Sequence, residues 1–227
     1  MRNFSRAILI ASIFATSLSA DPVRGIFASL NIGGAFISQN HDYTGPSGAT
    51  NKEKISKLST AFGASFGLLN QIEKTKAVIG GEASFSLNQA RQKYTLNANG
   101  GNTDGNLTIT NPYSFGVYGI AGMMMTPKLM FYGKAGYAWM KTQLKYTGLN
   151  GENPNFQTYK KTVSGVSGGA GINYLLTNKF MVGAEYLYHS PSSITPRNNN
   201  TPQGGQVRKF VYHPSVHTLN LKLSMLF

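Results

Sequence analysis

The side chains that could do chemistry in this chain are few, since it has four histidines, no cysteine and eight acidic residues. The best-spaced group is Glu185, His189 and Ser190. A hydrolytic serine on the same strand as its histidine should lie two residues away, because side chains two apart share a face. That position holds Pro191. The sequence therefore predicts that the protein is not an enzyme.

His213 and His217 form another closely spaced pair of histidines. Four residues of strand would separate them by about 13 Å, too far for two ligands of one ion. Without cysteine the chain can form neither a thiolate metal site nor a disulfide framework. No phosphate-binding loop or nucleotide motif occurs. We expect no metal, no cofactor and no nucleic acid partner.

Four charged residues lie in the middle of stretches in which apolar and polar residues alternate, and all four fall on the polar side. They are Glu82, Lys134, Glu185 and Lys222. Their charges cancel. The interior of a narrow eight-stranded barrel is filled by side chains, so unpaired ions there would be poorly solvated. We predict that the four form an internal salt-bridge network that blocks flow. The alternatives are four separately hydrated groups or a path for ions.

The last stretch of the chain shows what kind of element must hold such side chains. Its alternate residues divide into an apolar set (Leu219, Leu221, Leu223, Met225 and Phe227) and a polar set (Thr218, Asn220, Lys222 and Ser224). A strand buried on both faces would place Lys222 in an apolar layer without water. A transmembrane barrel, with lipid outside and a polar inner face, accommodates both sets.

Eight stretches alternate in this way. They are Ile26–Gln39, Leu58–Leu69, Ala77–Tyr94, Leu107–Met124, Leu129–Tyr146, Tyr159–Leu176, Lys179–His189 and His217–Phe227. Short links (70–76, 126–128 and 177–179) alternate with long ones (41–57, 97–106, 147–158 and 190–210). This pattern predicts an all-β fold, an eight-stranded antiparallel up-and-down transmembrane β-barrel with its long loops outside and both ends in the periplasm.

The beginning of the chain looks like a secretory leader. Arg2 and Arg6 precede an apolar run that ends at the small residues Ser19 and Ala20. The run is too short for the roughly 20 residues of a membrane-spanning helix, and no longer run follows it. We expect residues 1–20 to be a cleaved signal peptide and residues 21–227 to be the barrel, a single domain.

The charge of the chain is +13 overall and is unevenly distributed. The long loops and the strand ends beside them hold most of the excess, including Lys160, Lys161, Arg197, Arg208 and Lys209. We interpret these five residues as an anion-binding rim. Its partner could be lipopolysaccharide of the protein's own membrane, or host polyanions and surface proteins.

Several of these features resemble one family of bacterial proteins. The glycine-rich stretch Ser164–Asn173, the Gly183–Tyr188 stretch and the terminal Phe227 are similar to those of small outer-membrane β-barrels, a group that includes opacity proteins, the OmpA membrane domain and surface antigens of intracellular α-proteobacteria. The resemblance implies a Gram-negative outer membrane, a closed lumen, and recognition of Phe227 by the barrel-assembly machinery.

These observations together predict the function in outline. We expect a monomeric outer-membrane surface protein that stabilises the envelope and acts as an adhesin or surface antigen through its basic extracellular loops. The alternative is a pore-like barrel that binds small solutes or haem. A barrel enzyme that modifies lipid is disfavoured by the spacing after His189.

Overall fold

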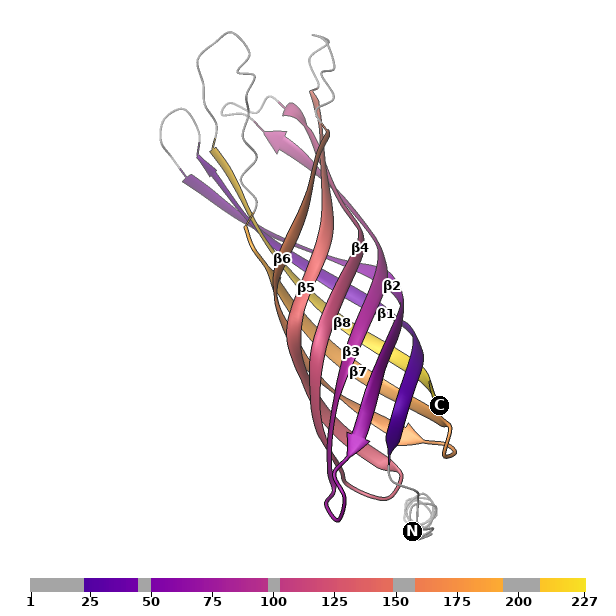
Figure 1. Cartoon of the computed structure of the whole chain (residues 1–227). Helices are drawn as coiled ribbons and strands as arrows, with labels where there is room; N and C mark the ends of the chain where they lie inside the picture. The colour runs from indigo at the N-terminus through magenta and orange to yellow at the C-terminus, as the bar shows by residue number, and fades with distance from the viewer. Residues whose placement is uncertain (1–22, 45–49, 98–102, 149–157, 194–208) are drawn as a thin grey trace, which may run out of the picture.

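The computed structural model describes residues 23–44, 50–97, 103–148, 158–193 and 209–227. They form eight strands: β1 (Arg24–Thr44), β2 (Thr50–Gln71), β3 (Ala77–Asn97), β4 (Thr103–Met124), β5 (Leu129–Gly148), β6 (Thr158–Leu175), β7 (Phe180–Pro191) and β8 (Lys209–Leu226). Each strand pairs antiparallel with its neighbour in the chain, and β8 pairs with β1 to close a barrel (Figure 1). The predicted fold is confirmed. The described residues include no helix long and apolar enough to cross a membrane.

The outer face of the barrel is apolar over a band of limited height. Leu30 and Leu221, for example, expose 68% and 64% of their surface there. On β1 the band runs from Ile26 to Phe36, which is about 33 Å along a strand. At the tilt usual for such barrels this spans about 25 Å, the thickness of an outer-membrane apolar band.

One edge of the band is marked by outward-facing rings, which we call the aromatic girdle: Phe36, Phe85, Tyr113, Phe115, Tyr137, Trp139, Tyr186, Tyr188 and His217. Phe115 and Trp139 stack with ring centroids 5.7 Å apart. Tyr186 and His217 form a hydrogen bond of 2.6 Å between Oη and Nδ1. Amphipathic rings of this kind are typical of a membrane–water interface.

The other end of the barrel is closed by short turns, two of which use the same device. The Oγ1 atoms of Thr126 and Thr177 each accept backbone N–H groups from the residues that start the next strand, Leu129 and Phe180, at 3.0 and 3.1 Å. The first residues of β1 and the terminal Phe227 lie at this same end (Figure 1). This arrangement places the strand ends that flank the long links at the girdle end.

The strands extend well beyond the girdle, which corrects two of the predicted loops. Residues 41–57 were expected to be a loop, yet β1 continues to Thr44 and β2 begins at Thr50, paired in unbroken register. Likewise β8 begins at Lys209 instead of His217. Beyond the membrane the outer face of a strand meets water instead of lipid, so the apolar alternation that marks a membrane-spanning strand is not required there.

The barrel wall divides where these extensions begin. Pairing of β2 with β3 stops at Ala61 and Asn88, and pairing of β7 with β8 stops at His189 and Val216. Beyond those pairs, β8, β1 and β2 continue as one sheet, and β3, β4, β5 and β6 continue as another. Figure 1 shows β1, β2 and β8 leaving the barrel on one side, apart from the ends of β5 and β6.

Candidate functional site

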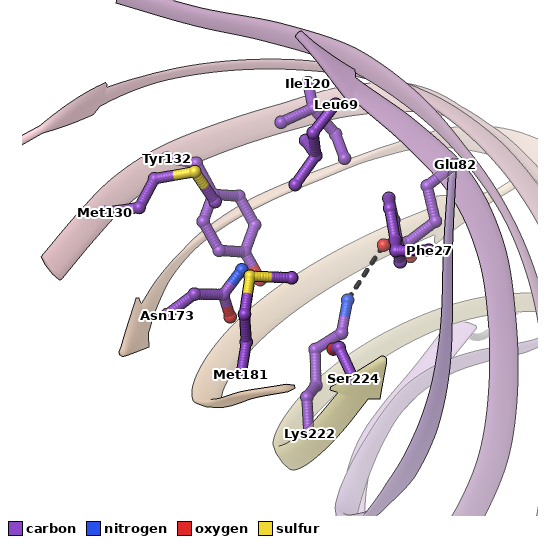
Figure 2. Close-up of a pocket in the computed structure, with 10 residues that line it drawn as sticks. All are labelled: Phe27, Leu69, Glu82, Ile120, Met130, Tyr132, Asn173, Met181, Lys222 and Ser224. Atoms are coloured by element: carbon purple, nitrogen blue, oxygen red, sulfur yellow. Dashed lines mark hydrogen bonds and ion pairs between the residues drawn. The ribbon is translucent and has the colours of Figure 1, made fainter. Parts of the chain in front are cut away.

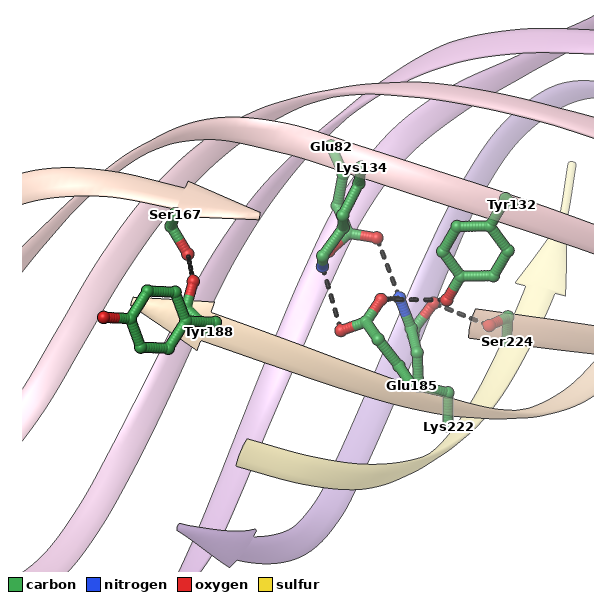
Figure 3. Close-up of polar contacts among 9 residues, drawn as sticks. Glu82, Tyr132, Lys134, Ser167, Glu185, Tyr188, Lys222 and Ser224 are labelled. Atoms are coloured by element: carbon green, nitrogen blue, oxygen red, sulfur yellow. Dashed lines mark hydrogen bonds and ion pairs between the residues drawn. The ribbon is translucent and has the colours of Figure 1, made fainter. Parts of the chain in front are cut away.

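Four charged side chains meet in the lumen, midway along the barrel. Lys134 Nζ lies 2.8 Å from Glu82 Oε1 and 2.9 Å from Glu185 Oε1, and Lys222 Nζ lies 2.8 Å from Glu82 Oε2 and 3.3 Å from Glu185 Oε2. Acid and base therefore alternate around a closed ring of ion pairs (Figure 3). The four side chains are 1–3% exposed. We call these four residues the charge ring.

Each member comes from a different strand, β3, β5, β7 or β8, and reaches the ring because register places it on the inner face. Two inward-facing tyrosines, which the sequence analysis did not assign to the network, complete the surroundings. Tyr132 donates its hydroxyl to Glu185 Oε2 at 2.8 Å, and the Lys134 ammonium lies 4.5 Å from the centroid of the Tyr118 ring. The Tyr132 signal was present, because it lies two residues before Lys134 and so shares its face.

The rest of the inner face departs from expectation, since it was predicted to be polar and much of it is apolar. One buried cluster lies toward the short turns: Val23, Phe27, Leu69, Val78, Ile120, Met124, Met130, Tyr132, Leu175, Met181 and Leu226. A second lies toward the girdle end: Ala35, Ile37, Ala61, Ile109, Met140, Leu144, Val163 and Val216. We call them the lower and upper apolar layers. The charge ring lies between these two layers, which separate it from bulk water.

The upper apolar layer also joins, at their base, the two sheets that extend beyond the girdle. Ala35, Ile37, Ala61 and Val216 come from β1, β2 and β8, and the other four members come from β4, β5 and β6. The layer therefore packs one sheet against the other, as in a small β-sandwich. This explains why inward positions just beyond the membrane need apolar side chains.

Little room remains in the lumen beside the ring. A cavity of about 10 Å³ lies between the ring and the lower apolar layer, lined by residues that include Glu82, Tyr132 and Lys222 (Figure 2). This is about the space that one water needs. A solute or haem could pass or lodge here only by displacing the side chains that fill the barrel.

Glu185 and His189 lie on the same inner face of β7, but no hydrogen bond joins them. Both oxygens of Glu185 are engaged by the ring lysines, and Oε2 also accepts from Tyr132. His189 lies close to the girdle end of β7 and is buried. No group of three or more potential metal ligands occurs among the described residues.

The basic rim is only partly within the described residues. Lys160 and Lys161 are exposed on β6, where they pair in register with Gln143 and Thr142. Thr142 is buried on the inner face, so successive lysines fall on opposite faces of the wall. Lys209 begins β8, and Arg197 and Arg208 lie outside the described residues.

Phe227 completes the last rung between β8 and β1. Its backbone N–H donates to Ile26 O at 2.9 Å, while the residue as a whole is 71% exposed. Gly25, at φ 144°, approaches its carbonyl so closely that a Cβ there would clash with it. The ring itself therefore buries little surface against the protein.

Deletion of Phe227 should reduce insertion of the barrel in cells while changing the stability of the folded barrel little. One terminal hydrogen bond contributes about 1 kcal/mol, so the refolded variant should lose no more than that in its free energy of unfolding. Insertion in cells should fall several-fold if the terminal aromatic is the assembly signal, as measured from the folded protein recovered in outer membranes. The control is Phe180→Ala, which removes a lipid-facing ring at the same end and should insert normally.

The family model of the outer membrane protein β-barrel domain matches residues 6–225 of the chain. The chain belongs to this family, and the protein is an outer-membrane β-barrel. A comparison with curated proteins finds no match.

Two of the solved structures to which the chain is similar, OprG and OmpT, give the same fold at low sequence identity. OprG from Pseudomonas aeruginosa is 11% identical, with 93% of this chain and 100% of that chain covered and a TM-score of 0.56. The outer membrane protease OmpT from Escherichia coli is 11% identical over 93% of this chain and 99% of its own, with a TM-score of 0.52. Neisserial surface protein A is 13% identical over 89% and 97%, with a TM-score of 0.45.

Proposed function

We propose that this barrel is a non-enzymatic surface protein that stabilises the envelope and binds anionic partners outside the cell through its basic rim. The observation that carries the proposal is the position of exposed lysines beyond the girdle. Lys93 on β3, Lys145 on β5, and Lys160 and Lys161 on β6 are all exposed. Each lies on an extracellular extension, past the last lipid-facing apolar residue of its strand: Leu87 on β3, Trp139 on β5 and Val166 on β6.

The distance of these lysines from the membrane favours an external partner over the membrane's own phosphates. Lys141 follows Trp139 by two residues and lies 5.8 Å from the Tyr113 ring, so it remains at the interface and can reach leaflet phosphates. Lys145 is six residues past Trp139, about 20 Å along the strand. Screening limits exposed charges to about 8 Å at physiological ionic strength.

Neutralising four rim residues should weaken binding to a sulfated polysaccharide. Exposed ion pairs contribute about 0.5 kcal/mol each, so replacing Lys160, Lys161, Arg208 and Lys209 by Gln should cost about 2 kcal/mol, or about thirtyfold in affinity. Binding of the unmodified protein to heparin should also fall steeply as salt rises. Affinity is measured with purified folded protein and with cells displaying it.

A matched control exists at the other end of the barrel. Lys74, Lys76, Lys128 and Lys179 lie in or beside the short turns, and replacing these four by Gln changes the net charge equally. That variant should bind heparin on intact cells as well as the parent does. Equal adherence by the rim variant, at matched surface density, would remove the electrostatic adhesin and leave an envelope-structural barrel.

The sealed lumen supports a structural role in preference to the pore-like alternative. Two apolar layers and a charge ring fill it in series. Within this proposal the protein is a monomer that contacts outer-membrane lipid and lipopolysaccharide, and the barrel-assembly machinery recognises Phe227. The engagement of Glu185 in ion pairs supports a role without catalysis.

A further inference from the structure

Two strand edges are open where the barrel wall divides between β2 and β3. Residues Thr50–Thr60 of β2 pair only with β1, and residues Ala90–Asn97 of β3 pair only with β4, within the part of the chain that the structure describes. Along an unpaired edge, every second residue presents its N–H and C=O groups outward. The two edges face the same break in the wall.

The break lies in water and not in lipid. Its first unpaired residues directly follow the rung between Ala61 and Asn88, and the adjacent rung joins the lipid-facing Phe62 and Leu87 at the upper end of the apolar band. Unpaired backbone groups are not tolerated against hydrocarbon, so the wall is continuous through the band and divides above it. An opening at this height gives access from outside the cell.

At the other break, between β7 and β8, the chain itself follows the β6 edge, while Lys209–Ser215 of β8 pair only with β1 among the described residues. Ser192, just after β7, donates its backbone N–H and its hydroxyl to Ser164 O on β6, at 2.9 and 2.6 Å. The continuation of β7 therefore begins along the β6 edge. No described segment of the chain runs along the open edges of β2 and β3.

Charge selects the partner of the open edges. The β2 edge carries Lys52, Lys54 and Lys57, and the β3 edge carries Arg91 and Lys93, against Glu53 as the acidic residue of the two segments. Lysines on an edge strand repel a second copy of the same edge and so oppose aggregation. The same lysines attract an extended chain of opposite charge.

We propose that the break between β2 and β3 is a docking site for an acidic, extended polypeptide segment, which adds to the open edge of β2 as an extra strand. Backbone hydrogen bonds would supply affinity, and the five basic residues would supply selectivity. The inference rests on the proposed function, because it names the chemistry of one class of external partner. It differs from electrostatic binding by the rim, because the partner must also supply backbone hydrogen bonds.

The test compares two peptides of identical sequence and charge. The probe is a peptide of about ten residues that alternates threonine and glutamate, long enough to cover the edge. Its partner is N-methylated on its central residues, which blocks hydrogen bonding on both sides of the strand. Fluorescence anisotropy with the folded protein in detergent should show at least about tenfold weaker binding of the methylated peptide. Equal binding of the two peptides overturns the docking site.

Two neighbouring proline substitutions in β2 give a test on the protein side. Consecutive backbone N–H groups point to opposite sides of a strand, so of Ile55→Pro and Ser56→Pro one breaks the ladder to β1 and the other removes only a group of the open edge. The variant that keeps the parent's thermal stability should lose peptide binding about tenfold and keep heparin binding. If it binds the unmodified peptide as the parent does, β2 is not the docking edge.

Heparin separates failure of this inference from failure of the proposed function. If heparin binding depends on the rim while the two peptides bind equally, the electrostatic adhesin stands and strand addition is wrong. If heparin binding is unaffected by the rim charges while only the unmethylated peptide binds, the edge is the binding site and the wider polyanion proposal is wrong.

Discussion

Gly136→Ala should strongly destabilise the closed barrel. Gly136 lies on the inner face of β5, two residues from Lys134, and pairs with Tyr118 of β4. A Cβ at this position would overlap the carbonyl oxygen of Val117 and would lie 2.8 Å from the Tyr118 Cα. These are backbone atoms of the adjacent strand, so they can yield only if β4 moves away from β5 and the ladder between them is disturbed.

The expected loss is about 3 kcal/mol, at the upper end of the usual range for overpacking. The folded fraction is measured from the different gel migration of boiled and unboiled samples, because a closed barrel resists detergent. The matched control is Gly119→Ala on β4. A Cβ there has its nearest neighbour, Ala135 O, at 3.9 Å, so this variant should fold as the parent does. Equal folding of both variants would show that β4 and β5 are not in close approach at Gly136.

The membrane-spanning part of the fold was predictable because lipid imposes a strict pattern. Every second residue of a spanning strand must be apolar, as Leu219, Leu221 and Leu223 illustrate. Outside the membrane that constraint disappears. Residues 41–57 read as a loop for this reason, although β1 and β2 cross most of that range.

The apolar layers were missed although a signal for them was present. Met130 and Met140 are an even number of residues from Lys134, and Met181 is four residues from Glu185, so all three share the inner face. The expectation of a polar interior suits a wide, water-filled barrel. A barrel this narrow fills its interior with side chains, and apolar ones pack there as they do in a soluble core.

The four members of the charge ring could be predicted from the sequence, but not which acid pairs with which base. Alternation assigned Glu82, Lys134, Glu185 and Lys222 to the inner face, and the structure brings the four together. Which acid meets which base depends on the register of all eight strands. Glu82 and Lys222 are 140 residues apart in sequence and still form an ion pair of 2.8 Å, because closure of the barrel brings their strands to facing positions across the lumen.

Glu82→Gln should reduce the free energy of unfolding by about 3–5 kcal/mol, the range for removing one partner of a buried ion pair. Glu82 bridges both ring lysines. Its neutralisation would leave Lys134 and Lys222 to share Glu185, with a net positive charge sealed between two apolar layers. The measurement is urea unfolding in lipid vesicles, followed by the fluorescence of Trp139, the single tryptophan, at the girdle.

A double variant tests the charge ring more directly than Glu82→Gln alone. Replacing Lys134 by Met together with Glu82→Gln restores charge balance, because Glu185 keeps Lys222 and the Tyr132 hydroxyl. This double variant should therefore be more stable than Glu82→Gln alone, since a balanced pair in an apolar setting costs less than an unpaired ion. Glu73→Gln in an exposed turn should change stability by less than about 0.5 kcal/mol. A neutral Glu82→Gln, together with steady ion conductance by the parent protein in planar bilayers, would show that the ring neither stabilises the barrel nor blocks it.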